Sequence, residues 1–203
     1  MVYSETVAPR LLNGKLALVT GAGQGNGRAI ALGLAQAGAR VVVTDMNTAA
    51  VQETARLVQA GGGNAWAYTL DVTVPDACTA LAARVNAEVG AIDILVNNAG
   101  IIIREGTDSE NAAANWKKTI DVNVHGTFNV SLAWLPAIQS TRGSIINIAS
   151  IAAYAGQAGS LGYSPDQPFS AVAVLNDEIV HARVQTGRFT PLTIEGRFGK
   201  NGS

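Results

Sequence analysis

The sequence predicts an α/β fold in which helices cover both faces of a doubly wound parallel sheet. Short apolar segments rich in β-branched residues alternate with longer helical segments over the first 150 residues, and a glycine-rich turn follows the first of them. Strands that alternate with helices form parallel sheets, and right-handed crossovers wind the chain over both faces. At 203 residues the chain fits one domain with a sizeable core, so residues 1–203 are predicted to form a single domain.

Five strands and four helices are expected before residue 151. Each strand is a short apolar run, and the predicted strands span residues 15–20, 41–45, 65–71, 92–97 and 143–150. The predicted helices span residues 28–37, 49–60, 74–89 and 116–136, and the first of them is apolar nearly all round and closed by Gly38. After residue 163 the alternation weakens, and one more helix is predicted at 168–185 from apolar residues that share a face.

Composition excludes several classes of function. The chain is 48% hydrophobic and 14% charged, which is typical of a globular protein. Its net charge of -1 offers no basic field for nucleic acid or an anionic membrane, and no long uncharged apolar run predicts a membrane span. The first residues lack a signal-peptide pattern, and the single cysteine cannot form an internal disulfide, so a cytoplasmic protein is expected. That cysteine, Cys78, is interpreted as a core residue.

A glycine-rich loop, Thr20–Gly27, joins the first strand to the first helix. Its sequence fits T-G-x-x-x-G-x-G rather than G-x-G-x-x-G. Glycines there permit positive φ and let backbone N–H groups approach a pyrophosphate, which the positive end of the helix also attracts. The residues predicted to bind it are Gly21, Gln24, Gly25, Asn26 and Gly27. The alternative is a tight turn without a ligand, which four glycines in seven residues disfavour.

Asp45 ends the second strand and is predicted to select the cofactor. A carboxylate at this place accepts hydrogen bonds from the adenosine ribose hydroxyls and repels a 2′-phosphate. Met46 and Asn47, which follow it, supply no cation. NAD is therefore predicted rather than NADP. The alternative is that Asp45 is a solvated strand end or a helix cap.

Several motifs resemble the short-chain dehydrogenase/reductase family, over residues 12–163. The matching segments are the glycine loop, Asp71-Val72, Asn97–Gly100 (NNAG), Asn123, Ser150 and Tyr163. The resemblance implies a Rossmann-like fold in which Asp71 and Val72 contact the adenine of the cofactor. It also implies that Asn98, Ala99, Gly100 and Tyr163 contribute to the cofactor site.

The resemblance implies a chemistry as well. The phenol of Tyr163 would move a proton to or from the substrate oxygen while a hydride passes to or from the nicotinamide. The hydroxyl of Ser150 would hold that oxygen by hydrogen bonding. Asn123 would help to hold a helix and a water in a proton relay. The expected partner is a small-molecule alcohol or ketone, and no metal site is predicted. Each of these residues has a plainer alternative. Asn123 could be an ordinary polar residue of a helix, Ser150 a strand cap, and Tyr163 an ordinary amphipathic tyrosine.

One position departs from the Y-x-x-x-K motif of the family. The segment from Tyr163 reads Tyr-Ser-Pro-Asp-Gln, so Gln167 stands where the family has a lysine that lowers the pKa of the phenol. Residues 164–203 also diverge from the family and end short of a typical member, so the C-terminal part of the sheet is expected to be incomplete. Three interpretations are open: a divergent relative, a shortened or altered chain, and an error in the recorded sequence.

Two functions from different classes follow. The first is an NAD-dependent oxidoreductase that interconverts a secondary alcohol and a ketone, impaired by the loss of the lysine. The second is a non-catalytic dinucleotide-binding or interaction protein, which Gln167 and the short tail favour. A homo-dimer or homo-tetramer is also predicted, because Thr127–Ile138 is apolar on more faces than one sheet can cover. Phe128 and Trp134 of this segment are expected at the surface.

Overall fold

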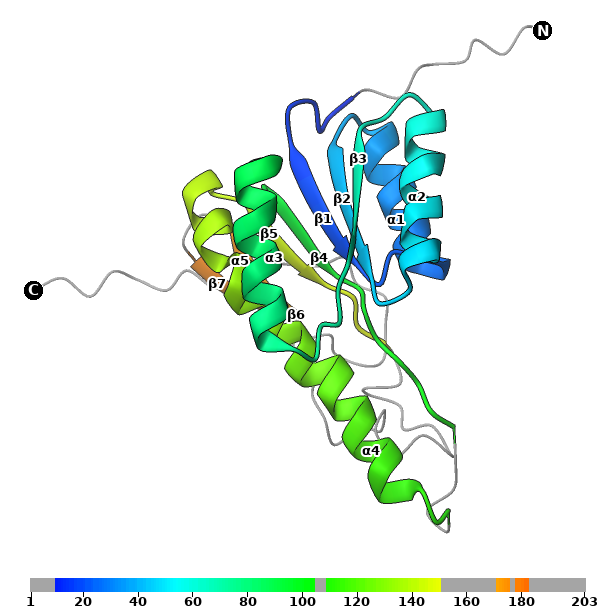
Figure 1. Ribbon diagram of the computed structural model, residues 1–203. Coiled ribbons are helices and arrows are strands. Elements are labelled where there is room, and N and C mark those ends of the chain that lie inside the picture. Colours follow the sequence, from blue (N-terminus) through cyan, green and yellow to red (C-terminus); the bar gives the residue numbers. More distant parts are fainter. Residues whose placement is uncertain (1–9, 105–108, 151–170, 176–177, 183–203) are drawn as a thin grey trace, which may run out of the picture.

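The computed structural model describes residues 10–104, 109–150, 171–175 and 178–182, and its parallel strands form one sheet (Figure 1). The sheet has five strands in the order β3-β2-β1-β4-β5. Their bounds are Leu16–Thr20 for β1, Arg40–Asp45 for β2, Ala65–Thr69 for β3, Ile94–Asn97 for β4 and Ser144–Asn147 for β5. The doubly wound parallel sheet predicted from the sequence is confirmed.

Helices connect consecutive strands, as predicted. They are α1 (Gly25–Gln36), α2 (Thr48–Ala60), α3 (Pro75–Glu88), α4 (Ala112–Ile120) and α5 (Thr127–Thr141). A π-helical segment, η1 (Asp121–Gly126), joins α4 to α5, so the helix predicted at 116–136 is a longer run with a widened middle. Helix α1 begins at Gly25 rather than at residue 28, so the end of the glycine loop is the first helical turn.

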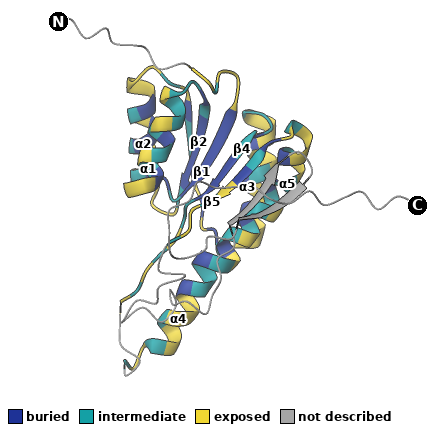
Figure 2. Ribbon diagram, turned by 180° about the vertical axis from the view of Figure 1, so that it is seen from behind, coloured by how far each residue is buried: buried dark blue, intermediate teal, exposed yellow. Residues whose placement is uncertain are grey.

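Two apolar clusters hold the layers together, one on each face of the sheet. Leu16 and Leu18 of β1 point to the cluster that α3 and α5 complete, whereas Val19 points to the cluster that α1 and α2 complete. This follows from the alternation of side chains along a strand. All of β1 is buried, as expected for a central strand of a parallel sheet, and Figure 2 shows these buried strands between the helices.

The order of the strands reverses between β1 and β4, which are neighbours although they are far apart in the sequence. Val19 of β1 pairs with Val43 of β2 on one side and with Val96 of β4 on the other. The chain therefore leaves β1 in one direction and β4 in the opposite direction. In open α/β sheets, ligands bind in the crevice that opens at the carboxyl ends of such a pair.

Cys78 lies in the core, as the sequence predicts. Its side chain is fully buried on α3, and its Sγ is 3.7 Å from the carbonyl oxygen of Val72. Burial first, and the negative charge of Asp71 second, raise the pKa of the Cys78 thiol to about 11. The thiol is therefore protonated at neutral pH, which makes it a packing residue rather than a nucleophile.

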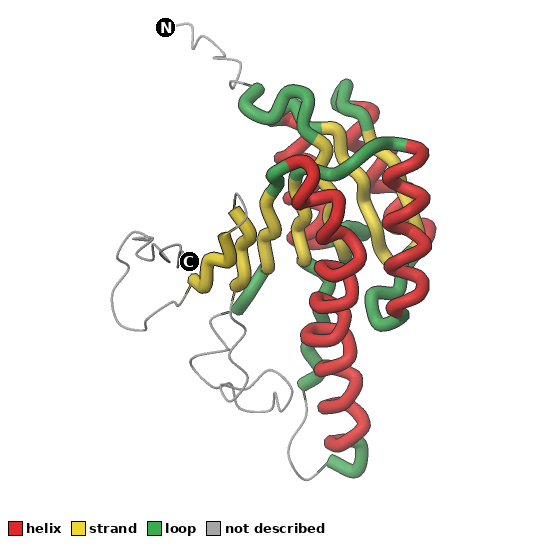
Figure 3. Tube along the Cα trace, turned by 90° about the vertical axis from the view of Figure 1, so that its left-hand side faces the viewer, coloured by secondary structure: helices red, strands yellow, loops and turns green. Residues whose placement is uncertain are grey.

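The helix predicted at 168–185 is wrong. Two antiparallel strands lie there instead, β6 (Ala171–Leu175) and β7 (Glu178–Ala182), with Ala173 paired to Val180. Both segments contain valine or isoleucine, which favour strands, and the Asn176-Asp177 pair between them is of a type that favours turns. Strand β6 lies beside β5 (Figure 3).

The expected exposure of Trp134 is also wrong. Its side chain is only 1% exposed, because it shares the sheet-facing side of α5 with Val130 and Ile138, four residues away in each direction. Phe128 is 63% exposed, as predicted. No helix in the described part of the chain is both long and apolar enough to cross a lipid bilayer.

Candidate active site

A cavity of about 1280 Å³ opens at the carboxyl ends of the strands, where the strand order reverses. Five parts of the chain line it: the glycine loop, the end of β2, the segment after β3, the segment after β4 and the inner side of α4 and η1. The end of β5, up to Ser150, completes the wall. Every described residue that the sequence assigns to the cofactor or to catalysis lines this cavity, except Gly25. Gly25 lies in the glycine loop but does not line the cavity.

The glycine loop needs glycine for two reasons: a positive φ at some positions and close packing at another. Gly21 and Gly25 have φ values of 60° and 53°. At Gly27 a Cβ atom would collide with the carbonyl oxygen of Gly21 and with Nδ2 of the Asn98 side chain. The loop is therefore folded tightly against the segment after β4, which explains the spacing of its glycines.

The first turn of α1 points its backbone N–H groups at this cavity. Gln24 forms no capping hydrogen bond with its side chain, and no acidic side chain occupies the first turn. The first N–H groups of a helix have no partner within the helix and carry partial positive charge. This helix end is therefore suited to an anion such as a pyrophosphate.

Thr20 and Asn98 fix the glycine loop to the end of β4. The hydroxyl oxygen of Thr20 accepts hydrogen bonds from the backbone N–H groups of Asn98 at 3.1 Å and Ala99 at 3.0 Å. The side-chain amide of Asn98 in turn donates to the carbonyl oxygens of Thr20 and Gly21, both at 3.0 Å. The amide of Asn98 thus holds the loop in place, and Asn98 also lines the cavity.

Asp45 lies against the glycine loop at the end of β2. Its Oδ2 accepts a hydrogen bond from the backbone N–H of Gly23, and its Oδ1 accepts one from the N–H of Asn47, each at 2.9 Å. Asn47, not Asp45, caps α2, because its Oδ1 accepts from the N–H of Ala50 at 3.0 Å. Each carboxylate oxygen of Asp45 retains a further lone pair for a ligand hydroxyl.

Asp71 and Val72 form the part of the cavity wall that follows β3. One carboxylate oxygen of Asp71 accepts from the backbone N–H and the hydroxyl of Thr73, at 2.9 and 2.7 Å. Val72 is buried, and its carbonyl oxygen accepts from the side chain of Asn129 at 3.1 Å. Gly126 packs so closely on Val72 that a Cβ there would lie 2.5 Å from Cγ2 of the valine.

Asn123 is buried in the π-helical segment η1 and clamps the loop after β4. Its Oδ1 accepts from the backbone N–H of Ile101 at 2.8 Å, and its Nδ2 donates to the carbonyl oxygen of Ile101 at 2.9 Å. The widened helical turn lets this side chain reach the loop beside Gly100. π-Helical turns occur frequently at functional sites.

A polar cluster that the sequence did not predict as functional lies behind Ser150. The side-chain amide of Asn97 donates to the hydroxyl of Ser131 at 2.9 Å and to Oδ1 of Asn147 at 2.8 Å. The N–H of Ile148 bonds to the carbonyl oxygen of Asn97 at 2.9 Å. The cluster fixes the end of β5, three residues before Ser150. No signal in the sequence connects these residues, because Asn97 and Asn147 meet only when β4 and β5 lie side by side.

Ser150 is half-buried and lines the same cavity as the glycine loop and Asn123. Tyr163 and Gln167 lie outside the described residues, as do residues 105–108 of the loop after β4. Among the residues that the structure does describe, no group of three or more histidine, cysteine or carboxylate side chains is arranged to hold a metal ion.

Comparison with known proteins identifies the family. Residues 15–165 match the family described as short chain dehydrogenase. The chain belongs to the short-chain dehydrogenase/reductase family. Its sequence is 36% identical to the cyclohexanol dehydrogenase of Acinetobacter sp. strain SE19 over 78% of this chain and 64% of that protein. It is 42% identical to the 2-dehydro-3-deoxy-D-gluconate 5-dehydrogenase of Bacillus subtilis over 71% of this chain and 56% of that protein.

Solved structures are similar to this one over most of the chain. A hydroxysteroid dehydrogenase from Escherichia coli gives a TM-score of 0.65 at 37% identity, covering 70% of this chain and 60% of its own. A protein from Beutenbergia cavernae, provisionally assigned as an NAD(P)-dependent gluconate 5-dehydrogenase with NADP at low occupancy, gives 0.70 at 35% identity. It covers 76% of this chain and 61% of its own.

The chain spans between about a quarter and two thirds of the length of the curated relatives it matches. The family match and the similar solved structures confirm the family and the fold that the motifs indicated. Family members bind nicotinamide dinucleotides, and in this chain the glycine loop, the end of β2 and the segment after β4 line one cavity.

Proposed function

We propose that this protein is an NAD-dependent oxidoreductase that interconverts a secondary alcohol and a ketone. The observation that carries the proposal is that one cavity is lined by both the glycine loop and Ser150. A dinucleotide bound to the loop would extend through this cavity toward the serine. Hydride transfer requires that cofactor and substrate meet in this way.

Three residues have separate tasks in this proposal. The bound cofactor would supply the hydride chemistry. The hydroxyl of Ser150 donates a hydrogen bond to the substrate oxygen, and the phenol of Tyr163 moves a proton to or from that oxygen. Asn123 fixes the loop at Ile101 and, with it, the shape of the cavity between the two ligands. The substrate is a small-molecule alcohol or ketone.

Asp45 is proposed to select NAD over NADP. Its carboxylate is held against Gly23, beside the glycine loop, and the next side chain, Met46, is exposed and uncharged. A 2′-phosphate bound there would face this carboxylate without a neighbouring cation, and like charges in contact disfavour binding.

We expect the chain to bind NADH more tightly than NADPH, and Asp45→Asn to narrow the ratio of the two dissociation constants by about tenfold. The asparagine keeps an oxygen that can accept from Gly23 but removes the charge. Fluorescence titration with both cofactors measures this. Glu53→Gln is the matched control, because Glu53 pairs with Arg56 on the surface of α2 and lies outside the cavity. Equal dissociation constants for the unaltered chain would contradict the assignment.

The alternative function is a non-catalytic dinucleotide-binding protein derived from the same family. Gln167 favours it, because the family's lysine is absent from this position. The two functions differ in one measurement: both bind NADH, but only the oxidoreductase reduces NAD in the presence of a panel of secondary alcohols. A cytoplasmic location remains a prediction from the single cysteine.

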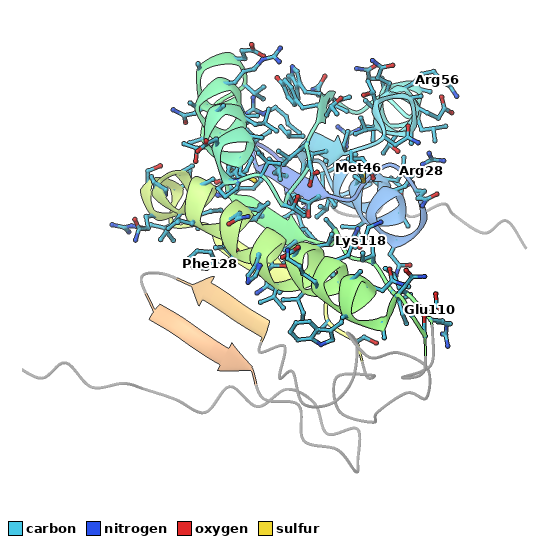
Figure 4. All side chains as sticks on the ribbon, turned by 60° about the horizontal axis from the view of Figure 1, so that its bottom comes forward. Arg28, Met46, Arg56, Glu110, Lys118 and Phe128 are labelled. Carbon is cyan, nitrogen blue, oxygen red and sulfur yellow. The ribbon has the colours of Figure 1, made fainter. Side chains whose placement is uncertain are left out.

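We also propose a homo-dimer or homo-tetramer that associates through α5. Phe128 and Leu132 are 63% and 58% exposed and lie four residues apart on one side of the helix. Figure 4 labels Phe128 on this helix. Large exposed apolar side chains that are neighbours on a helix are typical of an interface.

Sedimentation velocity at micromolar concentration is expected to show a dimer or tetramer, which Phe128→Glu shifts toward monomer. Gln139→Glu adds the same charge at an exposed polar position of α5 and is expected to leave the assembly unchanged. A monomer in the unaltered chain would refute this proposal.

A further inference from the structure

Helix α4 and the start of η1 together contribute a line of five residues to the cavity wall. Ala114, Lys117 and Lys118 belong to α4, and Asp121 and Val122 belong to η1. Spacings of three and four residues place side chains on one face of a helix, so the line is continuous. Two lysines therefore line the cavity that the glycine loop also lines.

The two lysines are in different electrostatic situations. The ammonium of Lys117 lies 2.5 Å from Oδ2 of Asp121, whose other oxygen is 3.2 Å from Nδ1 of His125. Lys118 is exposed, and its ammonium forms no hydrogen bond or ion pair with any residue that the structure describes. Its charge is therefore not compensated within the described part of the protein.

The other charged side chains that line the cavity are carboxylates with partners of their own. Asp45 accepts from Gly23 and Asn47, and Asp71 accepts from Thr73. Arg28, at the start of α1, is committed to the loop: its guanidinium donates to the carbonyl oxygen of Gly23 and, at 3.0 Å, to the hydroxyl of Thr54. Lys118 is thus the cavity-lining cation that is free among the described residues.

A dinucleotide brings a doubly charged pyrophosphate to the glycine loop. The end of α1 offers it only partial positive charge and backbone N–H groups. An ammonium on a flexible stem provides a full charge and three donors, and it can reach a phosphate oxygen across a cavity. Figure 4 shows Lys118 on the side of α4 that faces α1, which places the stem in the right direction.

We propose that Lys118 binds the pyrophosphate of the dinucleotide from the side opposite to the glycine loop. The inference rests on the proposed function, since it assumes that a dinucleotide occupies this cavity. The pyrophosphate would then be bound both by the backbone amides of the glycine loop and by a side chain of α4. Because Lys117 is already paired with Asp121, the assignment is to one of two adjacent lysines.

The test compares Lys118→Gln with Lys117→Gln, which remove the same charge one residue apart. Dissociation constants for NADH, NADPH, ADP-ribose and adenosine are measured by isothermal titration calorimetry at low and high salt. Lys118→Gln is expected to weaken NADH, NADPH and ADP-ribose by about 5- to 10-fold, and to reduce the dependence of binding on salt. Adenosine, which has no phosphate, is expected to bind unchanged. Lys118→Arg should restore most of the affinity.

Four outcomes would overturn the inference. A loss confined to NADPH would assign Lys118 to the 2′-phosphate instead of the pyrophosphate. Equal losses for Lys117→Gln and Lys118→Gln would show a general effect of charge. Unchanged affinity in Lys118→Gln, with the unaltered chain binding NADH, would reject this contact and leave the proposed function intact. No binding of NADH or NADPH by the folded, unaltered chain would reject both.

Discussion

Alcohol oxidation by this chain is expected to be very slow near pH 7 and to rise toward pH 10. The reason lies at Gln167, which stands four residues after Tyr163, where the short-chain dehydrogenase/reductase family has a lysine. Without a neighbouring cation, a tyrosine has a pKa near 10, so only about one phenol in a thousand is ionised at pH 7. Loss of a downward shift of about two to three pKa units corresponds to a rate lower by about a hundred- to a thousandfold.

The measurement is the pH–rate profile of NAD reduction with a secondary alcohol that the chain accepts. Tyr163→Phe should remove the rise at high pH, because the ionising group is gone. Gln167→Lys should raise the rate at pH 7 if residue 167 stands beside the nicotinamide ribose. A rate at pH 7 equal to that at pH 10, and abolished by Tyr163→Phe, would show that another cation has replaced the lysine.

Gly27→Ala is expected to have the second largest effect, on both binding and stability. The added Cβ would enter space filled by the carbonyl oxygen of Gly21 and the side-chain nitrogen of Asn98. Backbone atoms cannot move aside as a flexible side chain can, so the loop and the segment after β4 must separate. Overpacking of this kind costs about 1–3 kcal/mol, and the displaced loop should bind NADH at least about tenfold more weakly.

Gly33→Ala is the matched control in the same helix. No atom lies within 4 Å of a Cβ at this position, and Gly33 is exposed in the interior of α1. Alanine is the better helix former there, so the variant should be about 0.5–1 kcal/mol more stable and bind NADH normally. Thermal unfolding and NADH titration of both variants decide the matter. A Gly27→Ala chain as stable as Gly33→Ala would contradict the described geometry of the loop.

The fold could be predicted from the sequence as far as side-chain periodicity carries information. The short apolar run of β1 and the glycines after it identified a buried strand. The position of Trp134 was not predictable, because α5 is apolar on several sides and the pattern did not show which side meets the sheet. The hairpin of β6 and β7 was missed because a short apolar segment fits either period, and the predicted helix used the wrong one.

The sequence predicted those parts of the candidate site that depend on residues close together in the chain. Asp45 and the glycine loop act through backbone geometry near them in the chain, and the structure places both at one cavity. The contacts of Asn97 with Ser131 and Asn147, and the free charge of Lys118, depend on segments that are distant in the sequence. They could be found only once β4, β5 and α4 were placed in space.

The most direct test of the central claim is calorimetric titration of the folded chain with NADH. The described loop, Asp45 and the segment after β4 predict saturable binding at one site per chain, and ADP-ribose should compete for that site. The catalytic residues are not needed for this result, so it holds for an active and for an inactive protein. A chain that is folded by circular dichroism but shows no saturable binding of NADH or NADPH would contradict the assignment of the cavity as a dinucleotide site.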